Sequence, residues 1–131
     1  MIKQKKISSS KLVKKKLFRA IIHFLNSSFN NTIISITDLN GNVLFWSSAG
    51  NCGFKGSRKS TPFASQIVSE TVLRKVVEYG IKQLEINISG ISSGRDSAIR
   101  SVQNFGLSIT VIRDVTSIPH NGCRPKKKRR V

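Results

Sequence analysis

The residues best suited to chemistry lie in a loop at about 49–60, where glycines and cations interleave. The glycines are Gly50, Gly53 and Gly56, and the cations are Lys55, Arg58 and Lys59. Glycines let backbone N–H groups approach a polyanion closely, and the Thr61-Pro62 pair that follows is typical of a helix start, which attracts anions. The pattern predicts that Lys55, Arg58 and Lys59 hold phosphate groups. A flexible, solvated loop without a ligand is the alternative.

A second concentration of charge lies at the C-terminal end. Residues 124–130 contain no acid and six bases: Arg124, Lys126, Lys127, Lys128, Arg129 and Arg130. Residues 1–19 contain eight Lys or Arg and no acid, so most of the net charge of +17 lies at the two ends. Like charges at this density do not pack together, and nucleic acid is the commonest polyanion that binds them. We therefore predict a basic N-terminal arm at 1–16, an α/β domain at 17–118 and a basic nucleic-acid-binding tail at 119–131. Both arms are expected to be disordered until nucleic acid binds.

The acidic residues and the possible metal ligands do not indicate catalysis. Asp38, Asp96 and Asp114 could be imagined as a metal-binding carboxylate set, but a turn, a first helical turn and a strand end account for them one by one. His120 and Cys123 supply only two zinc ligands. The glycine loop lacks both the Gly-x-Ser-x-Gly elbow of hydrolases and the Gly-Lys-Ser/Thr ending of a Walker loop. The sequence predicts no enzymatic activity, no metal and no cofactor.

Other features narrow the class of protein. The chain has no apolar run of about 18 residues, so we expect no membrane span. The N-terminal residues lack the apolar region of a secretory signal. Cys52 and Cys123 are far apart in the 131-residue chain, which favours a reducing compartment over a disulfide.

The elements that must position the cations can be read from hydrophobic patterns. Strands are expected at 17–25, 32–37 and 43–47, the last two joined by a tight turn in which Asn40-Gly41 supplies the positive φ angles. A helix is expected at 62–79, ending at Gly80, with a buried stripe of Val68, Val72, Leu73 and Val76. A strand at 84–88, a helix at 95–105 and a strand at 107–112 follow. The fold class is therefore α/β, with a mixed sheet of about five strands and flanking helices.

Three long motifs resemble a known family. They are residues 28–32 (SFNNT), 53–64 (GFKGSRKSTPFA) and 119–125 (PHNGCRP). They look like the universal small-subunit ribosomal protein eleven family of organellar or bacterial type, and the resemblance covers about residues 17–131. It implies a ribonuclease-H-like topology without nuclease activity. The implied role is a structural constituent of the small ribosomal subunit that binds 16S-type rRNA on the platform and supports translation near the messenger exit region.

The resemblance also implies further contacts. Within the matched motifs, Asn30, Asn31, His120 and Asn121 are added to the RNA-binding residues. Arg95 is carried over as an RNA contact, although residues 89–95 (SGISSGR) depart from the family's usual Lys-Gly-Pro-Gly-x-Gly-Arg run. The implied partners are small-subunit rRNA, messenger RNA nearby, and the subunit proteins numbered six, seven, eighteen and twenty-one. A free RNA-binding or RNA-processing factor on the same fold is the alternative function.

The composition indicates where such a protein works. It is rich in Ile, Asn, Lys and Phe, which AT-rich codons favour, and this suggests an organellar genome. We expect an organelle-encoded protein of the mitochondrial ribosome, with a plastid or a bacterial cytoplasm as alternatives.

Overall fold

The computed structural model describes residues 19–131, and for residues 19–25 it describes the backbone alone. The elements run in the order β1 (Arg19–Ser27), β2 (Thr32–Thr37), β3 (Val43–Ser48), η1 (Gly56–Ser60), α2 (Pro62–Tyr79), β4 (Gln83–Gly90), α3 (Gly94–Asn104) and β5 (Ser108–Asp114). The N-terminal arm expected at 1–16 lies outside the described residues, as do the first two residues of the strand expected at 17–25.

The five strands form one mixed sheet in the order β3-β2-β1-β4-β5. β1 pairs antiparallel with β2, and β2 antiparallel with β3. β1 pairs parallel with β4, and β4 parallel with β5. The α/β class and the ribonuclease-H-like topology are thereby confirmed. β1 extends to Ser27, beyond the expected end, because Ser27 still pairs with Thr32 on one side and Gly90 on the other.

The hairpin between β2 and β3 is present, but its turn differs from the expected one. Gly41 has a φ of +95°, whereas Asn40 is not among the residues with positive φ. The backbone N–H of Gly41 donates to the Asp38 carbonyl (3.2 Å), and that of Asp38 donates to the Asn42 carbonyl (3.0 Å). This is the three-residue type of hairpin loop, which needs one left-handed residue and not two. The Asp38 carboxylate accepts hydrogen bonds from the N–H groups of Asn40 and Asn42 and thereby stabilises the turn.

Helix α2 begins and ends where the sequence predicts. The Thr61 hydroxyl accepts a hydrogen bond from the N–H of Ala64 (3.3 Å), Pro62 takes the first helical position, and Gly80 ends the helix at a φ of +95°. The predicted stripe of Val68, Val72, Leu73 and Val76 is buried. Local capping chemistry and helical periodicity together determine this element.

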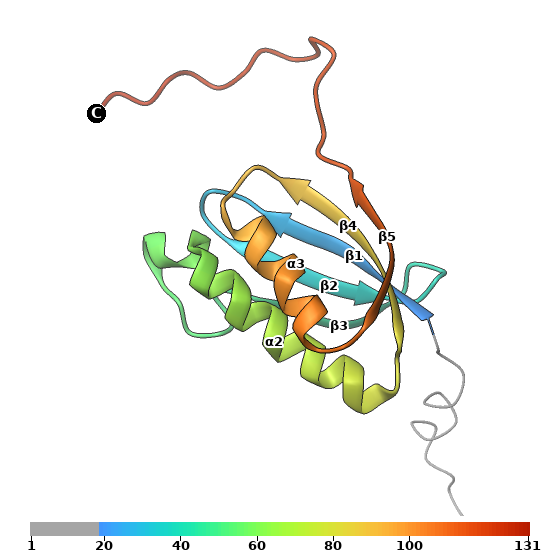
Figure 1. Ribbon diagram of the computed structural model, residues 1–131. Helices are drawn as coiled ribbons and strands as arrows, with labels where there is room; N and C mark the ends of the chain where they lie inside the picture. The colour runs from blue at the N-terminus through green and yellow to red at the C-terminus, as the bar shows by residue number, and fades with distance from the viewer. Residues whose placement is uncertain (1–18) are drawn as a thin grey trace, which may run out of the picture.

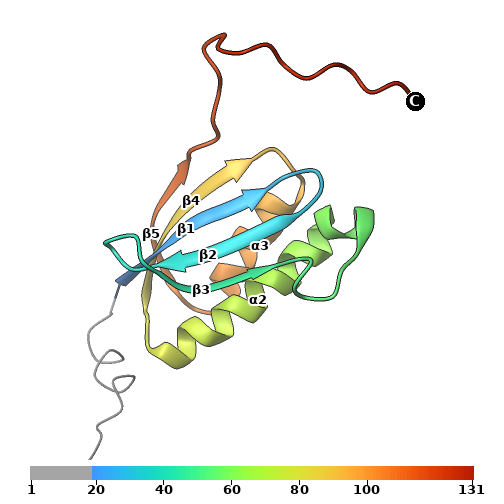
Figure 2. The same ribbon diagram turned by 180° about the vertical axis from the view of Figure 1, so that it is seen from behind.

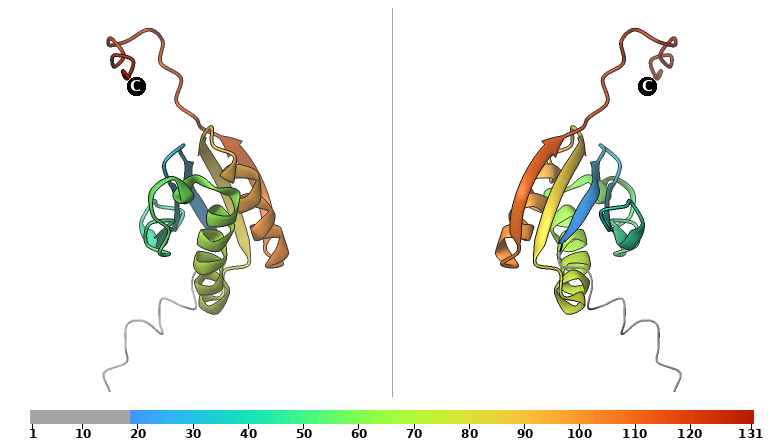
Figure 3. Two further views of the ribbon diagram at one scale, coloured as in Figure 1. Left: turned by 90° about the vertical axis from the view of Figure 1, so that its left-hand side faces the viewer. Right: turned by 90° about the vertical axis from the view of Figure 1, so that its right-hand side faces the viewer.

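Helices α2 and α3 lie side by side on one face of the sheet (Figures 1 and 3). Their buried residues pack against Ile34 and Ile36 of β2 and against Leu84, Ile86 and Ile88 of β4. Seen from behind, the opposite face carries no helix of the described residues (Figure 2). No helix in the range 19–131 is both long and apolar enough to cross a membrane.

Candidate nucleic-acid interface

The topology brings the predicted RNA-binding segments to one end of the sheet. The parallel strands β1, β4 and β5 all end there, and their last residues are neighbours: Ser27 pairs with Gly90, and Ile88 with Asp114. β3 ends at the same side, because Ser48 pairs with Ile33 at the start of β2. Four segments therefore lie at this end of the sheet: the 28–31 turn, the glycine loop, the start of α3 and the first residues of the tail (Figure 1).

The glycine loop has a defined conformation with its own backbone hydrogen bonds. Its first half is closed by backbone hydrogen bonds from Phe54 to Ala49 (3.1 Å) and from Cys52 to Ser48 (3.0 Å). Its second half, which the sequence predicts as irregular, forms the 3₁₀ helix η1. The Arg58 carbonyl accepts the Thr61 hydroxyl hydrogen bond (2.8 Å), so η1 leads directly into the α2 N-terminus. The interleaved glycines Gly53 and Gly56 have φ angles of +93° and +61°, which a side chain would strain.

The cations of the loop face solvent beside two aromatic rings. Lys55 and Arg58 are exposed and Lys59 is half-buried. A hollow of about 440 Å³ is lined by Gly53, Phe54, Lys55 and Arg58. The rings of Phe54 and Phe63 meet edge to face with centroids 6.1 Å apart. Phe63, in the first turn of α2, is 62% exposed.

The 28–31 turn places the two predicted asparagines differently. Asn30 is exposed at the tip. Asn31 is half-buried, and its side-chain oxygen accepts a hydrogen bond from the N–H of Thr32 (2.9 Å). The Ser28 hydroxyl donates to the Asn31 carbonyl (3.1 Å) and closes the turn. Asn30 is thus free to reach a ligand, while the oxygen of Asn31 shapes the turn that presents it.

The tail at 119–131 is exposed along its whole length and contains no helix or strand (Figure 1). It carries the predicted residues His120, Asn121, Arg124, Lys126, Lys127, Lys128, Arg129 and Arg130. Asn121 and Gly122 have φ angles of +75° and +42°. The two successive positive angles that the sequence suggests for Asn40-Gly41 therefore occur in this second Asn-Gly pair.

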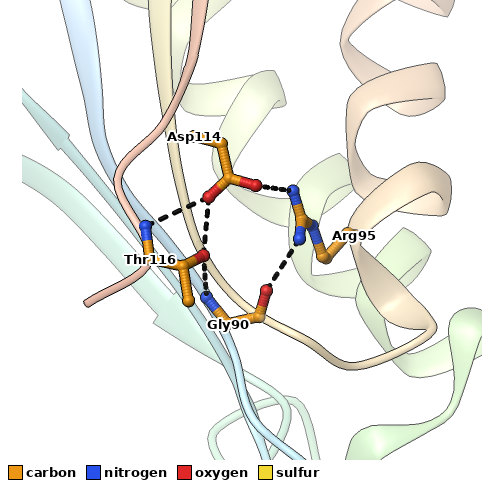
Figure 4. Close-up of polar contacts among 4 residues, drawn as sticks. All are labelled: Gly90, Arg95, Asp114 and Thr116. Atoms are coloured by element: carbon orange, nitrogen blue, oxygen red, sulfur yellow. Dashed lines mark hydrogen bonds and ion pairs between the residues drawn. The ribbon is translucent and has the colours of Figure 1, made fainter. Parts of the chain in front are cut away.

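Arg95, in the first turn of α3, has partners within the domain (Figure 4). Its Nη2 lies 2.7 Å from the Asp114 carboxylate, and its Nη1 donates to the Gly90 carbonyl (2.9 Å). The Thr116 hydroxyl and the Arg95 guanidinium both hold the pKa of Asp114 down, to about 2. Sequence reasoning carried Arg95 over as an RNA contact and did not identify Thr116. The Asp-x-Thr spacing typical of an Asx turn was the available signal.

The three aspartates considered for a metal site do not come together. Asp38 lies in the β2–β3 turn at the opposite end of the sheet, Asp96 in the first turn of α3, and Asp114 at the end of β5. No group of three or more His, Cys, Asp or Glu side chains that could hold a metal occurs among residues whose side chains are described. Each aspartate has the position that its sequence context predicts.

The sequence matches a known protein family along almost its whole length. The family model described as ribosomal protein S11 matches residues 20–130. The small ribosomal subunit protein uS11c of Mesostigma viride is 56% identical to the chain over 131 residues, which is the full length of both proteins.

Proposed function

Because the chain belongs to the ribosomal protein S11 family, and is therefore a structural constituent of the small ribosomal subunit and not an enzyme, we propose which of its residues bind rRNA. The proposed interface is the end of the sheet where β1, β4 and β5 stop. It comprises the 28–31 turn, the loop at 49–60 and the tail at 119–131. In this proposal the domain at 17–118 presents the loop, and the tail binds as a separate basic segment.

One observation carries the proposal: segments far apart in sequence place their cations at a single end of the sheet. Lys55 and Arg58 are exposed next to the N-terminus of α2, whose backbone N–H groups favour anions. The six bases of residues 124–130 depart from the same end. Phosphate oxygens are the group that such an array of cations recognises, and they position a protein on RNA without reading its sequence.

The individual residues divide by their surroundings. Direct contact with rRNA is proposed for the exposed or partly exposed members: Asn30, Lys55, Arg58, Lys59, His120, Asn121, Arg124, Lys126, Lys127, Lys128, Arg129 and Arg130. Asn31 and Arg95 already have intramolecular partners. We assign them an indirect role, in shaping the turn and the start of the tail.

As a component of the small subunit, the protein has rRNA and other ribosomal proteins as neighbours. The finer placement is part of the proposal: the platform, with messenger RNA nearby at the exit region and with proteins numbered six, seven, eighteen and twenty-one alongside. This placement rests on the family resemblance of the three motifs. Crosslinking from Asn30 and from the tail, followed by identification of the linked proteins and nucleotides, would test it.

The organelle is also a proposal. The plastid-type name of the uS11c relative points to an organellar ribosome. The mitochondrial ribosome expected from composition is not confirmed, and full-length identity of 56% to that relative favours a plastid ribosome. Purified plastids and mitochondria probed with one antibody would separate the two.

Sedimentation in a sucrose gradient tests the function itself. We expect the protein to migrate with small subunits at low magnesium, when the two subunits separate, and to remain there after a moderate salt wash. A free RNA-binding or RNA-processing factor would instead stay near the top of the gradient or leave with the wash. That result would overturn the proposal.

A further inference from the structure

Four residues form a closed set of polar contacts where the tail begins (Figure 4). Besides its contacts with Arg95, Asp114 accepts hydrogen bonds at one carboxylate oxygen from the Thr116 hydroxyl (2.6 Å) and the Thr116 N–H (3.0 Å). The Thr116 hydroxyl in turn accepts a hydrogen bond from the N–H of Gly90 (3.2 Å). Gly90 therefore contacts Thr116 through its N–H and Arg95 through its carbonyl. We call Gly90, Arg95, Asp114 and Thr116 the tail clip.

The fold requires a close approach at this point. β4 and β5 are parallel neighbours that end together, and the N–H of Val115 still donates to the Ile88 carbonyl (2.8 Å). A Cβ at Gly90 would overlap the Ser27 carbonyl oxygen, so only glycine lets this member of the clip lie against β1. The clip thus holds the end of β5 against the end of β4 and the first turn of α3.

Residues 114–116 and the residues that follow them differ sharply in how many contacts hold them. Residues 114–116 are fixed by five hydrogen bonds to Ile88, Gly90, Arg95 and each other. From Ser117 onward every residue is exposed, and the strongly basic segment begins eight residues after Thr116. The last fixed point before the tail therefore determines where the tail leaves the domain.

We propose that Arg95, Asp114 and Thr116 are positioning residues for RNA binding: the clip fixes the point from which the basic tail leaves the domain, so that tail and loop can contact the same RNA together. This inference rests on the proposed rRNA-binding function. Its physical basis is effective concentration: two linked binding segments gain avidity only where their geometry lets both engage at once. None of the three residues needs to touch RNA itself.

A direct RNA contact by Arg95 is the competing explanation, and the sign of one substitution separates the two. Asp114→Asn removes a negative charge and frees the Arg95 guanidinium. If Arg95 binds phosphate directly, this variant should bind RNA as tightly as the wild type or more tightly. If the clip positions the tail, Asp114→Asn, Arg95→Gln and Thr116→Val should all weaken binding, although they change the net charge in opposite directions or not at all.

The experiment measures the affinity of the full-length protein for a transcript of small-subunit rRNA at fixed salt. Arg100→Gln removes the same charge from an exposed site on α3 without touching the clip. Asp38→Asn makes the same carboxylate-to-amide change in a turn at the other end of the sheet. Both controls should bind within about twofold of the wild type. Circular dichroism and thermal unfolding establish that each variant is folded.

Each clip variant is then combined with deletion of residues 119–131. We expect the three single substitutions to weaken binding about fivefold or more, a part of the 100-fold or greater avidity that linkage can supply. In the truncated protein the same substitutions should not change the affinity for the transcript, because there is no tail to position. Tighter binding of Asp114→Asn, or an equal loss in the truncated protein, would overturn the inference.

Failure of the proposed function has a different signature. If deletion of 119–131 alone leaves the affinity for rRNA unchanged, the tail is not a binding segment and the proposed function is wrong in that part. If deletion weakens binding but the clip variants do not, the function stands and the positioning role is refuted.

Discussion

At the scale of one residue, Asp114 illustrates how a carboxylate that resembles a metal ligand in the sequence is held by contacts within the domain. It was considered as a metal ligand, yet its two oxygens are occupied by Arg95 and by the hydroxyl and N–H of Thr116. These donors all favour the ionised carboxylate, the Thr116 hydroxyl most strongly, which explains why the pKa falls to about 2 despite exposure to solvent.

The lowered pKa has a testable consequence for pH dependence. A carboxyl whose pKa is lowered by folding contributes stability above its ordinary pKa of 3.8, and that contribution is lost as the pH falls toward about 2. We expect a carboxyl titration followed by NMR to place Asp114 near 2 in the wild type. In Thr116→Val, and to a smaller extent in Arg95→Gln, the midpoint should rise toward 3.8. Asp38, whose pKa is lowered mainly by Asn42, serves as internal control and should not move. A wild-type midpoint near 3.8 for Asp114 would show that the clip does not form in solution.

Two Asn-Gly pairs provide a second test at this scale. Asparagine deamidates when the backbone nitrogen of the next residue attacks its side chain, and glycine does not hinder the attack. The N–H of Gly41 is engaged by the Asp38 carbonyl (3.2 Å), whereas Asn121 and Gly122 are exposed in the tail. Peptide mapping of aged free protein should therefore find isoaspartate at Asn121 well before Asn40. Modification of Asn40 first would refute the assignment of a held turn and an accessible tail.

At the scale of elements, the sequence predicted best where local rules decide. α2 has a capping threonine, a proline at its first position, a glycine at its end and a regular apolar stripe, and its bounds agree with the prediction. The β2 strand and the hairpin were likewise predictable from β-branched residues and an Asn-Gly pair. The end of β1 was not, because it depends on pairing with two strands distant in sequence.

The candidate site was predicted in its composition and not in its geometry. The cations at 55, 58 and 59 and the basic tail could be identified from charge alone. The intramolecular partners of Arg95 could not, since Gly90 and Asp114 meet it only after β4 and β5 pair in parallel.

Because the helix core is buried and the loop cations lie at the surface, we expect their substitutions to affect the free energy of unfolding differently. Val72 is 1% exposed and packs with α2 and sheet residues of the core. Val72→Ala should lower the free energy of unfolding by roughly 1–3 kcal/mol, by lost burial and a residual cavity. The triple Gln variant of Lys55, Arg58 and Lys59 changes two exposed side chains and one half-buried side chain. It should lower the free energy of unfolding by about 1.5 kcal/mol at most, because surface substitutions usually stay within about 0.5 kcal/mol per site. Urea unfolding measures both variants, and a loss of more than about 1.5 kcal/mol in the triple variant would mean that the loop cations are structural.

At the scale of the whole molecule, an α/β domain with an apolar core carries a strongly cationic segment at each end of its sequence. The six bases of residues 124–130 repel one another and have no acidic residue among them. We therefore predict that residues 119–131 of the free protein give narrow, poorly dispersed amide signals by NMR, which broaden and disperse when rRNA is added. Residues 114–116, held by the clip, should be dispersed in both states. Dispersed tail signals without RNA would show that the tail has a fixed structure of its own.

Loop and tail are proposed to bind phosphates from one end of the sheet, and the salt dependence of rRNA binding measures how many phosphates each of them contacts. Each phosphate contact contributes about 0.9 to the slope of log affinity against log salt on duplex DNA and roughly 0.7 on single strands. Replacing Lys55, Arg58 and Lys59 by Gln should flatten that slope by about 2, and deleting residues 119–131, with six bases, by about 4. Val72→Ala should leave the slope unchanged while it lowers stability. If both charge variants keep the wild-type slope, phosphate binding by this end of the sheet is contradicted.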